Sequence, residues 1–353
     1  MKKTLLALTV AATTFGAIQT ADACSRLIFD GGEQYGSVVV RTFEWNDDQP
    51  LQSIAKAIPV GTVIEGKDVP EYKKRATWTA KHHVVDYVEF NTFHNTSGEA
   101  INDKGLSSSM LYQAPSAEFI KDADDTGAPT VHLSDIVNYM VTQFATVDEA
   151  VESFEKGEFQ VAWKTGIGGH QHGFHFSVQD KSGAVALFQL YEGGEMVVHK
   201  GDIHMDLAVM ANKPLRRDVL EHMAQFDMDD TTKMPADISS HSRYVRGNHA
   251  VRHTKIDPTL DWIDVRGKAK SAFDWGNKIP QDIGDPTNDG ETYATWETYV
   301  YNLNDLDTTY YNEGNGTQLE IDFGETKAFS KTMCANIFEQ AKTQQNVTWA
   351  PCK

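Results

Sequence analysis

The predicted strands of this chain occur in hairpin groups, and pairs of predicted helices separate the groups. Residues 25–29 and 37–42 flank Gly31-Gly32, which is a hairpin signal, and a second hairpin is predicted within residues 174–191. Hairpins imply antiparallel sheets, and grouped helices imply layers on sheet faces. The pattern predicts an α+β fold. A four-layer α/β/β/α sandwich of two antiparallel sheets fits it, and periodicity alone leaves other α+β arrangements open.

Apolar periodicity and turn residues place the remaining elements. Further strands are expected at residues 54–60, 83–90, 196–199, 292–302, 308–311 and 318–323. Helices are expected at residues 133–144, 214–226, 242–252, 268–275 and about 325–344, with one more that begins at the Thr146/Glu149 capping box and stops at Gly157.

The first 23 residues have the three parts of a secretory signal peptide. Two lysines begin it, residues 5–18 are mostly apolar, and residues 21–23 read Ala-Asp-Ala, an A-x-A cleavage site. The apolar run is too short for a spanning helix of about 20 residues, and no later segment reads as a membrane span. We therefore expect residues 1–23 to be removed, Cys24 to become the first residue, and the protein to be periplasmic or secreted.

A lipoprotein is the competing interpretation of a cysteine at this place. It would make the protein a lipid-anchored binding protein acylated on Cys24. Lipidation normally requires an aliphatic residue three places before the cysteine and a small residue two places before it. Ala21 and Asp22 occupy these places, so the sequence favours cleavage without lipidation.

The composition of residues 24–353 restricts the partners of the protein. These 330 residues are enough for one large domain or two small ones. Their net charge is −19, against −18 for the whole chain, because the leader carries two Lys and one Asp. This acidic balance argues against nucleic acid, whose affinity for proteins comes largely from basic contacts to phosphate. It also argues against docking on anionic lipid.

Three cysteines remain after the leader: Cys24, Cys334 and Cys352. In an oxidising compartment the last two are able to pair and tie down the C-terminal tail, and the sequence leaves open whether they do. Cys24 is then the unpaired cysteine. An unpaired thiol in an exported protein is expected to be either buried or chemically functional.

Cys24 at a new N-terminus would carry a nucleophile and a base in one residue. A thiol has an ordinary pKa near 8.5 and an α-amine one near 7.7–8.0, so the free amine can take the thiol proton. The hairpin returns Arg41 and Glu44 toward Cys24. Arg41 would stabilise the thiolate and Glu44 would orient the amine. A surface ion pair between Arg41 and Glu44 at the end of the sheet is the alternative.

Several short motifs run in order along nearly the whole mature chain. They are Cys24-Ser-Arg, Arg41-Thr-Phe-Glu44-Trp45, residues 101–106, residues 175–183, Met210-Ala-Asn212-Lys-Pro214, Ser242-Arg243-Tyr-Val-Arg246 and Thr295-Trp296. Together they resemble the choloylglycine hydrolase and penicillin V acylase family of N-terminal-nucleophile hydrolases. The resemblance implies one hydrolase domain over residues 24–353 and cleavage of a linear amide bond.

The resemblance assigns roles to the residues around the thiol. Cys24 would be the nucleophile and, through its amine, the base, with Arg41 beside the thiol. The family usually has Asp three residues after that Arg, whereas this chain has Glu44. A chain in which Glu44 fails to replace the Asp would be an inactive relative.

Further roles concern the oxyanion that forms during acyl transfer. Asn212 would donate its side-chain amide, the backbone N–H of Tyr112 would be the second donor, and Arg243 would complete the polar site. Tyr112 falls where bile-salt hydrolases have Asn and exported Gram-negative relatives tend to have Tyr. Trp45 either lines an apolar acyl pocket or belongs to the core.

The expected substrate is a small amide with a bulky apolar acyl group. Penicillin V is the first candidate, and conjugated bile acids and N-acyl homoserine lactones are the alternatives within the family. The resemblance also implies a homotetramer.

Other polar clusters are interpreted as unliganded. His170, His172 and His175 form an H-x-H-x-x-H pattern on a Gly-rich segment, and residues 122–125 and 285–291 are acidic. Neither acidic segment has the twelve-residue ligand pattern of a Ca²⁺ loop. We expect no metal and no cofactor.

Overall fold

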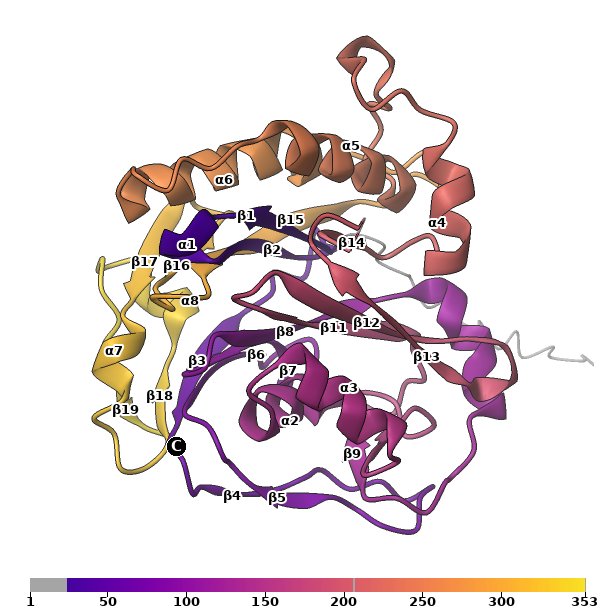
Figure 1. The fold of residues 1–353 in the computed structure, drawn as a ribbon, viewed down its shortest axis with the longest axis vertical. Helices are drawn as coiled ribbons and strands as arrows, with labels where there is room; N and C mark the ends of the chain where they lie inside the picture. The colour runs from indigo at the N-terminus through magenta and orange to yellow at the C-terminus, as the bar shows by residue number, and fades with distance from the viewer. Residues whose placement is uncertain (1–23, 206, 353) are drawn as a thin grey trace, which may run out of the picture.

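The computed structural model describes residues 24–205 and 207–352, so the expected signal peptide lies outside the described residues. Two antiparallel sheets face each other, and helices cover the outer face of each one (Figure 1). The predicted α/β/β/α sandwich is confirmed. None of the helices in the described part of the chain is long and apolar enough to cross a bilayer.

The smaller sheet has six strands and contains the start of the mature chain. In spatial order they are β14 (Val209–Ala211), β1 (Ser25–Asp30), β2 (Ser37–Asn46), β15 (Tyr293–Asn302), β16 (Thr308–Asn312) and β17 (Thr317–Ile321). A short helix, α1 (Gly32–Tyr35), joins β1 to β2 in the predicted hairpin. The sheet therefore brings residues from both ends of the sequence beside β1.

The larger sheet has nine strands. In spatial order they are β13 (Met196–Asp202), β12 (Ala184–Leu190), β11 (Phe174–Asp180), β8 (Leu106–Tyr112), β7 (Thr96–Asn102), β6 (Val84–Glu89), β3 (Ser53–Ile58), β18 (Met333–Ala335) and β19 (Ala350–Pro351). Two small sheets, β4 (Val63–Glu65) with β5 (Thr77–Thr79) and β9 (Thr130–His132) with β10 (Gln160–Ala162), lie outside it.

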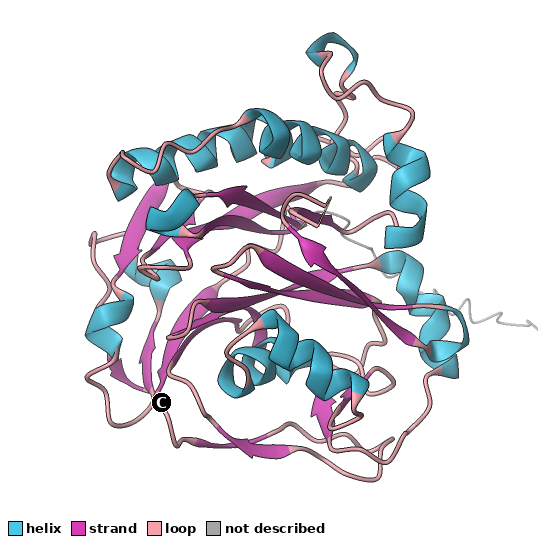
Figure 2. Ribbon diagram, viewed as in Figure 1, coloured by secondary structure: helices cyan, strands magenta, loops and turns pink. Residues whose placement is uncertain are grey.

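Helices form the two outer layers, as the cyan ribbons of Figure 2 show. The helices α5 (Ser240–His253) and α6 (Trp262–Asn277) pack on the six-stranded sheet, and α2 (Ile136–Gln143) and α3 (Val147–Glu155) pack on the nine-stranded sheet. The Thr146 side chain caps α3 by accepting from the Glu149 N–H, as predicted. The remaining helices are α4 (Arg216–Met223), α7 (Phe323–Thr326), α8 (Ile337–Gln340) and the 3₁₀ segments Ala114–Asp122, Leu133–Asp135, Glu192–Gly194 and Thr231–Lys233.

The predicted C-terminal helix at 325–344 is wrong. Two short helices, α7 and α8, occupy that stretch, and each begins at its own cap, Asp322 and Asn336. Between them, β18 pairs with β3 at the sheet edge, with Cys334 opposite Lys56. The backbone there satisfies its hydrogen bonds across the sheet, which a helix would prevent.

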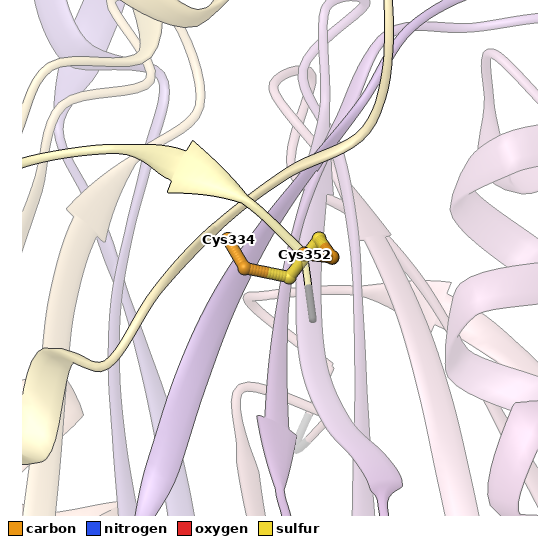
Figure 3. The surroundings of a disulfide bond; sticks show 2 residues. All are labelled: Cys334 and Cys352. Carbon is orange, nitrogen blue, oxygen red and sulfur yellow. A yellow bond between two sulfur atoms is a disulfide. The ribbon is translucent and has the colours of Figure 1, made fainter.

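The C-terminal tail is fastened by a disulfide between Cys334 and Cys352, which settles the pairing that the sequence left open (Figure 3). The bond joins β18 to the residue that follows β19 and closes a loop with a sequence separation of 18. Through β18, it holds the tail against β3 in the large sheet.

Replacing Cys334 and Cys352 together by serine is expected to lower the free energy of unfolding by about 3 kcal/mol, because a loop of this length gains that much chain entropy in the unfolded state. Urea denaturation of the oxidised protein and the double variant measures the difference. The natural protein with its disulfide reduced is the control, and its free energy of unfolding is expected to match that of the double variant. A difference below about 1 kcal/mol would contradict the structural role.

Glu297 ties the two sheets together from a fully buried position on β15. Its carboxylate accepts from the Ser53 N–H at 3.0 Å, the Ser53 hydroxyl at 2.5 Å and the Tyr310 hydroxyl at 2.8 Å. Burial raises the pKa of this carboxyl to about 7. The folded protein therefore keeps a proton that the unfolded chain releases near pH 4.3.

Stability should depend on pH through this group. Below the pKa that Glu297 has in the unfolded chain, its contribution to the free energy of unfolding is fully present. This contribution is lost as the pH rises through about 7, the pKa of Glu297 in the folded protein. Relative to a Glu297→Gln variant, the natural protein should gain on the order of 2 kcal/mol of unfolding free energy between about pH 8 and pH 5. Urea denaturation of both proteins across that range measures it, and a constant difference would contradict it.

Candidate active site

Cys24 lies at the start of β1, on the side of the strand that faces the other sheet. Arg26 and Arg41 are cross-strand partners and belong to that inner side. Ser25 alternates with them and faces the helices, where its hydroxyl accepts from Arg243 of α5 at 2.5 Å. By the same alternation, the Cys24 side chain points inward, beside Arg41.

Arg41 is buried next to the thiol. Its guanidinium donates to the Met110 carbonyl at 2.7 Å and lies 4.2 Å from the centroid of the Phe43 ring. Burial raises the pKa of the Cys24 thiol, and the positive charge of Arg41 is the first of the effects that lower it again. The predicted neighbourhood of Arg41 and Cys24 is confirmed.

Glu44 is buried on the opposite side of β2 from Arg41, at 1 % exposure. Thr295 donates to its Oε1 at 2.8 Å, whereas its Oε2 has no hydrogen-bond partner among the described residues. Burial raises the pKa of Glu44 to about 7, and the charge of Arg243 is the first of the effects that lower it. The alternative of a surface ion pair with Arg41 is wrong, because both side chains are buried and Arg41 pairs elsewhere.

Asn212 reaches the site because β14 pairs with β1, with Ala211 opposite Ser25. Its amide nitrogen donates to the Tyr112 carbonyl at 2.7 Å, and its oxygen accepts from Arg243 at 3.2 Å. Arg243 also donates to the Cys24 carbonyl at 3.0 Å. Arg243 therefore fixes which end of the Asn212 amide faces Tyr112.

The backbone N–H and carbonyl of Tyr112 face the Asn212 amide. Gln113 donates its N–H to the Gly173 carbonyl, so the N–H of its neighbour Tyr112 points to the opposite edge of β8. The Tyr112 carbonyl, on that same edge, accepts from Asn212. The two predicted oxyanion donors, the Asn212 amide and the Tyr112 N–H, thus lie side by side.

A narrow, mostly apolar pocket opens at the thiol. It is lined by Cys24, Arg41, Phe43, Glu44, Trp45, Glu89, Phe93, Thr96, Gly98, Met110, Tyr112 and Phe174. Trp45 and Phe93 meet edge to face with their ring centroids 4.7 Å apart, and both are partly exposed. Trp45 therefore lines the pocket and also packs against the core, so the structure does not choose between the two interpretations open to it.

Sequence reasoning missed most of this lining. Phe43 stands between two predicted site residues on β2, and its place on the inner face follows from strand alternation with Arg41. Phe93, Met110 and Phe174 come from three separate segments, and nothing local in the sequence marks them. Glu99, which forms an ion pair with Arg41, was also missed.

The histidine pattern does not assemble a metal site in the described part of the chain. Burial lowers the pKa of His175 to about 3, and its ring lies 3.0 Å from the Gln189 amide. Within residues 24–205 and 207–352, no group of three or more His, Cys, Asp or Glu side chains is arranged to hold a metal ion.

The structure places the Cys24 thiol and Arg41 at one apolar pocket, with the Asn212 amide bonded to the Tyr112 backbone at its edge. Such an arrangement is able to carry out acyl transfer. Residues 24–320 match the family described as linear amide C-N hydrolases, choloylglycine hydrolase family. The chain belongs to this family. The protein is thus a hydrolase of linear amide C–N bonds, and the family match begins at Cys24.

Known relatives agree with this assignment. The chain is 25 % identical to a penicillin V acylase of Pectobacterium atrosepticum over 273 residues, which is 76 % of this chain and 70 % of the relative. A penicillin V acylase from Agrobacterium tumefaciens shares the fold with a TM-score of 0.76 and 19 % identity, covering 94 % and 99 % of the two chains. A mutant form of a conjugated bile acid hydrolase from Clostridium perfringens shares it with a TM-score of 0.65 and 14 % identity, covering 94 % and 97 %.

Proposed function

We propose that Cys24 is the N-terminal nucleophile of an exported hydrolase that releases a bulky apolar acid from an amide. The observation that carries this proposal is the aromatic pocket that opens at the Cys24 thiol, beside the Asn212 amide and the Tyr112 edge of β8. The pocket would take the acyl group and leave the amine half toward solvent.

The reaction would proceed in two steps. The α-amine of Cys24 takes the thiol proton, and the sulfur attacks the amide carbon, forming a C–S bond. The oxyanion is stabilised by the Asn212 amide and the Tyr112 N–H, and the C–N bond breaks as the amine leaves with the proton from the α-ammonium. Water then hydrolyses the thioester, which restores the thiol and releases the acid.

Glu44 would hold the α-ammonium in this scheme. Its Oε2 is a buried acceptor without a hydrogen-bond partner among the described residues, and an ammonium group at the start of β1 would supply the missing donor. The longer side chain of Glu, relative to the Asp usual in the family, is fixed from its other oxygen by Thr295.

The leader would direct export of the protein, and its removal would activate the protein by freeing the α-amine of Cys24. Two observations support this: the Ala-Asp-Ala sequence at residues 21–23, and the Cys334–Cys352 disulfide, because such bonds persist in oxidising compartments. We therefore propose a periplasmic or secreted location. The intact mass of the exported protein tests it: a mass beginning at an unmodified Cys24 supports the hydrolase mechanism, whereas a lipid on Cys24 supports the lipid-anchored alternative and removes the base.

Penicillin V is our first candidate substrate, because the pocket is narrow and lined by aromatic rings that suit a phenoxy group. Conjugated bile acids and long-chain N-acyl homoserine lactones are the other outcomes. The purified mature protein should be assayed on penicillin V, a glycine-conjugated bile acid and a long-chain acyl homoserine lactone. The highest kcat/KM is expected for penicillin V, and absence of hydrolysis on all three would overturn the proposal.

We also propose the homotetramer that the family resemblance implies. Light scattering after size-exclusion chromatography measures the mass in solution. A mass of one mature chain, somewhat below the 39.3 kDa of the full chain, would contradict the tetramer.

A further inference from the structure

Glu99 is a fully buried carboxylate in the space between the two sheets. It belongs to β7 of the large sheet, and its Oε2 lies 3.6 Å from Arg41 Nε on β2 of the small sheet. The exposed fractions of the two side chains are 0 % and 1 %. Neither of these two atoms has a hydrogen-bond partner among the described residues, so the ion pair is the contact that both make.

The other carboxylate oxygen of Glu99 is held from both sheets. The Ser109 hydroxyl of β8 donates to Oε1 at 3.0 Å, and the Tyr301 hydroxyl of β15 donates to the same oxygen. These two donors fix the plane of the carboxylate and leave Oε2 turned toward Arg41. The arrangement orients an anion toward one guanidinium rather than merely filling the core.

Arg26 explains why Arg41 needs such an anion. The two arginines are cross-strand partners on β1 and β2, both buried, and like charges in such a pair repel each other. Arg26 donates to the Leu207 carbonyl at 3.2 Å. The Glu99 carboxylate is close enough to attract both guanidinium groups. Without it, Arg41 would keep the Met110 carbonyl and the Phe43 ring but would lose its carboxylate partner against the repulsion of Arg26.

We propose that Glu99 is a positioning residue that holds the Arg41 guanidinium beside the Cys24 thiol against the repulsion of Arg26. This inference rests on the proposed role of Cys24 as nucleophile. Glu99 touches neither the pocket nor the thiol, so it would act on the reaction only through Arg41.

The charged and titratable groups around this network come from several strands and one helix. The thiol is faced by Arg41, Glu44 and Arg243, and Glu99 is faced by Arg26, Arg41, Tyr87 and Tyr301, with His175 near both arginines. Burial raises the pKa of Glu99 to about 7, with Arg41 as the first of the effects that lower it. Glu99 is therefore ionised in the alkaline range where the thiol titrates.

The rate at which iodoacetamide alkylates Cys24, measured against pH, tests the inference without any amide substrate. Cys24 is the free cysteine of the described residues, and the other two are bonded to each other. In Glu99→Gln, the alkylation midpoint is expected to rise by about one pH unit, because Arg41 is no longer held at the sulfur. An unchanged midpoint would overturn the proposal. A lowered midpoint would also overturn it, because it would show that Glu99 acts only as a remote negative charge.

A double-mutant cycle separates positioning from general damage. In an Arg41→Gln background, Glu99→Gln should add no further shift, since the residue through which it acts is gone. Glu297→Gln is the matched control, since it removes another buried carboxylate between the sheets that is held by hydroxyl donors; its midpoint should stay at that of the natural protein. An equal shift in Glu297→Gln would overturn the proposal.

A gentler variant keeps the test available if Glu99→Gln does not fold. Tyr301→Phe removes one hydroxyl that donates to Glu99 and keeps the ring. The midpoint should rise in the same direction by a smaller amount, and no rise would contradict the inference. Hydrolysis of penicillin V by the natural protein is a separate measurement, so failure of the proposed function and failure of this inference are told apart.

Discussion

Replacing Cys24 by alanine is expected to reduce amide hydrolysis by roughly 10⁴-fold or more, because it removes the atom that forms the acyl-enzyme. The fold should survive, since the thiol makes one weak hydrogen bond, 4.0 Å from the Glu44 carbonyl oxygen, and lines the pocket at the margin of the core. Turnover of the best substrate, together with the thermal unfolding midpoint, measures both parts of this expectation.

Cys24→Ser is the matched control for that loss. Serine keeps the α-amine and a nucleophilic oxygen in the same place, but its hydroxyl is a much weaker nucleophile than a thiolate. Its activity should lie at or below a small fraction of that of the natural protein. Intact mass must show that each variant begins at residue 24. Full activity in either variant would disprove the mechanism, and the pocket would then need another nucleophile.

Replacing Asn212 by alanine is expected to lower kcat by roughly 10²–10³-fold, which corresponds to about 2.7–4 kcal/mol of transition-state stabilisation. Its amide is held from one side by Arg243 and points its nitrogen along the Tyr112 edge of β8. KM should change less than kcat, because the oxyanion forms only after the substrate has bound. Steady-state kinetics on the best substrate measures both constants.

Asn277→Ala is a suitable comparison for Asn212→Ala. Asn277 is equally buried, but its amide donates to the Arg243 carbonyl at 3.1 Å and the Ser25 hydroxyl at 3.3 Å, whereas the Asn212 amide donates to the Tyr112 carbonyl. Asn277→Ala should lose stability while keeping a kcat close to that of the natural protein. If both variants lost kcat equally, the effect of Asn212 would be attributable to packing.

The sequence predicted the part of the site that lies close along the chain. A hairpin after Cys24 brings Arg41 and Glu44 back to it, and the structure confirms this from the pairing of β1 with β2. Asn212 and Arg243 come from distant segments, and only the family resemblance connected them to Cys24. The spacing of these residues in the sequence does not predict that either one lies near Cys24, since long-range contacts depend on how the whole sandwich packs.

The strands β7 and β8 were not predicted because they violate the expected pattern. They carry Glu99 and a run of three serines, residues 107–109, in positions that are fully buried. Pattern reasoning assigns such residues to loops or to solvent, since buried polar groups are expensive unless they are hydrogen-bonded. Here they bond one another between the sheets: the Gln179 amide, for example, donates to Ser107 and Ser109.

The C-terminal tail, which the disulfide holds in place, also forms one edge of the large sheet. The outermost strand, β19, has two residues, and its last, Pro351, has no N–H to offer. A strand from another molecule would find almost no backbone donors or acceptors in register there, and open sheet edges are the usual starting points of aggregation. The Cys334–Cys352 bond therefore protects β3 and β18 from intermolecular pairing as well as holding the tail.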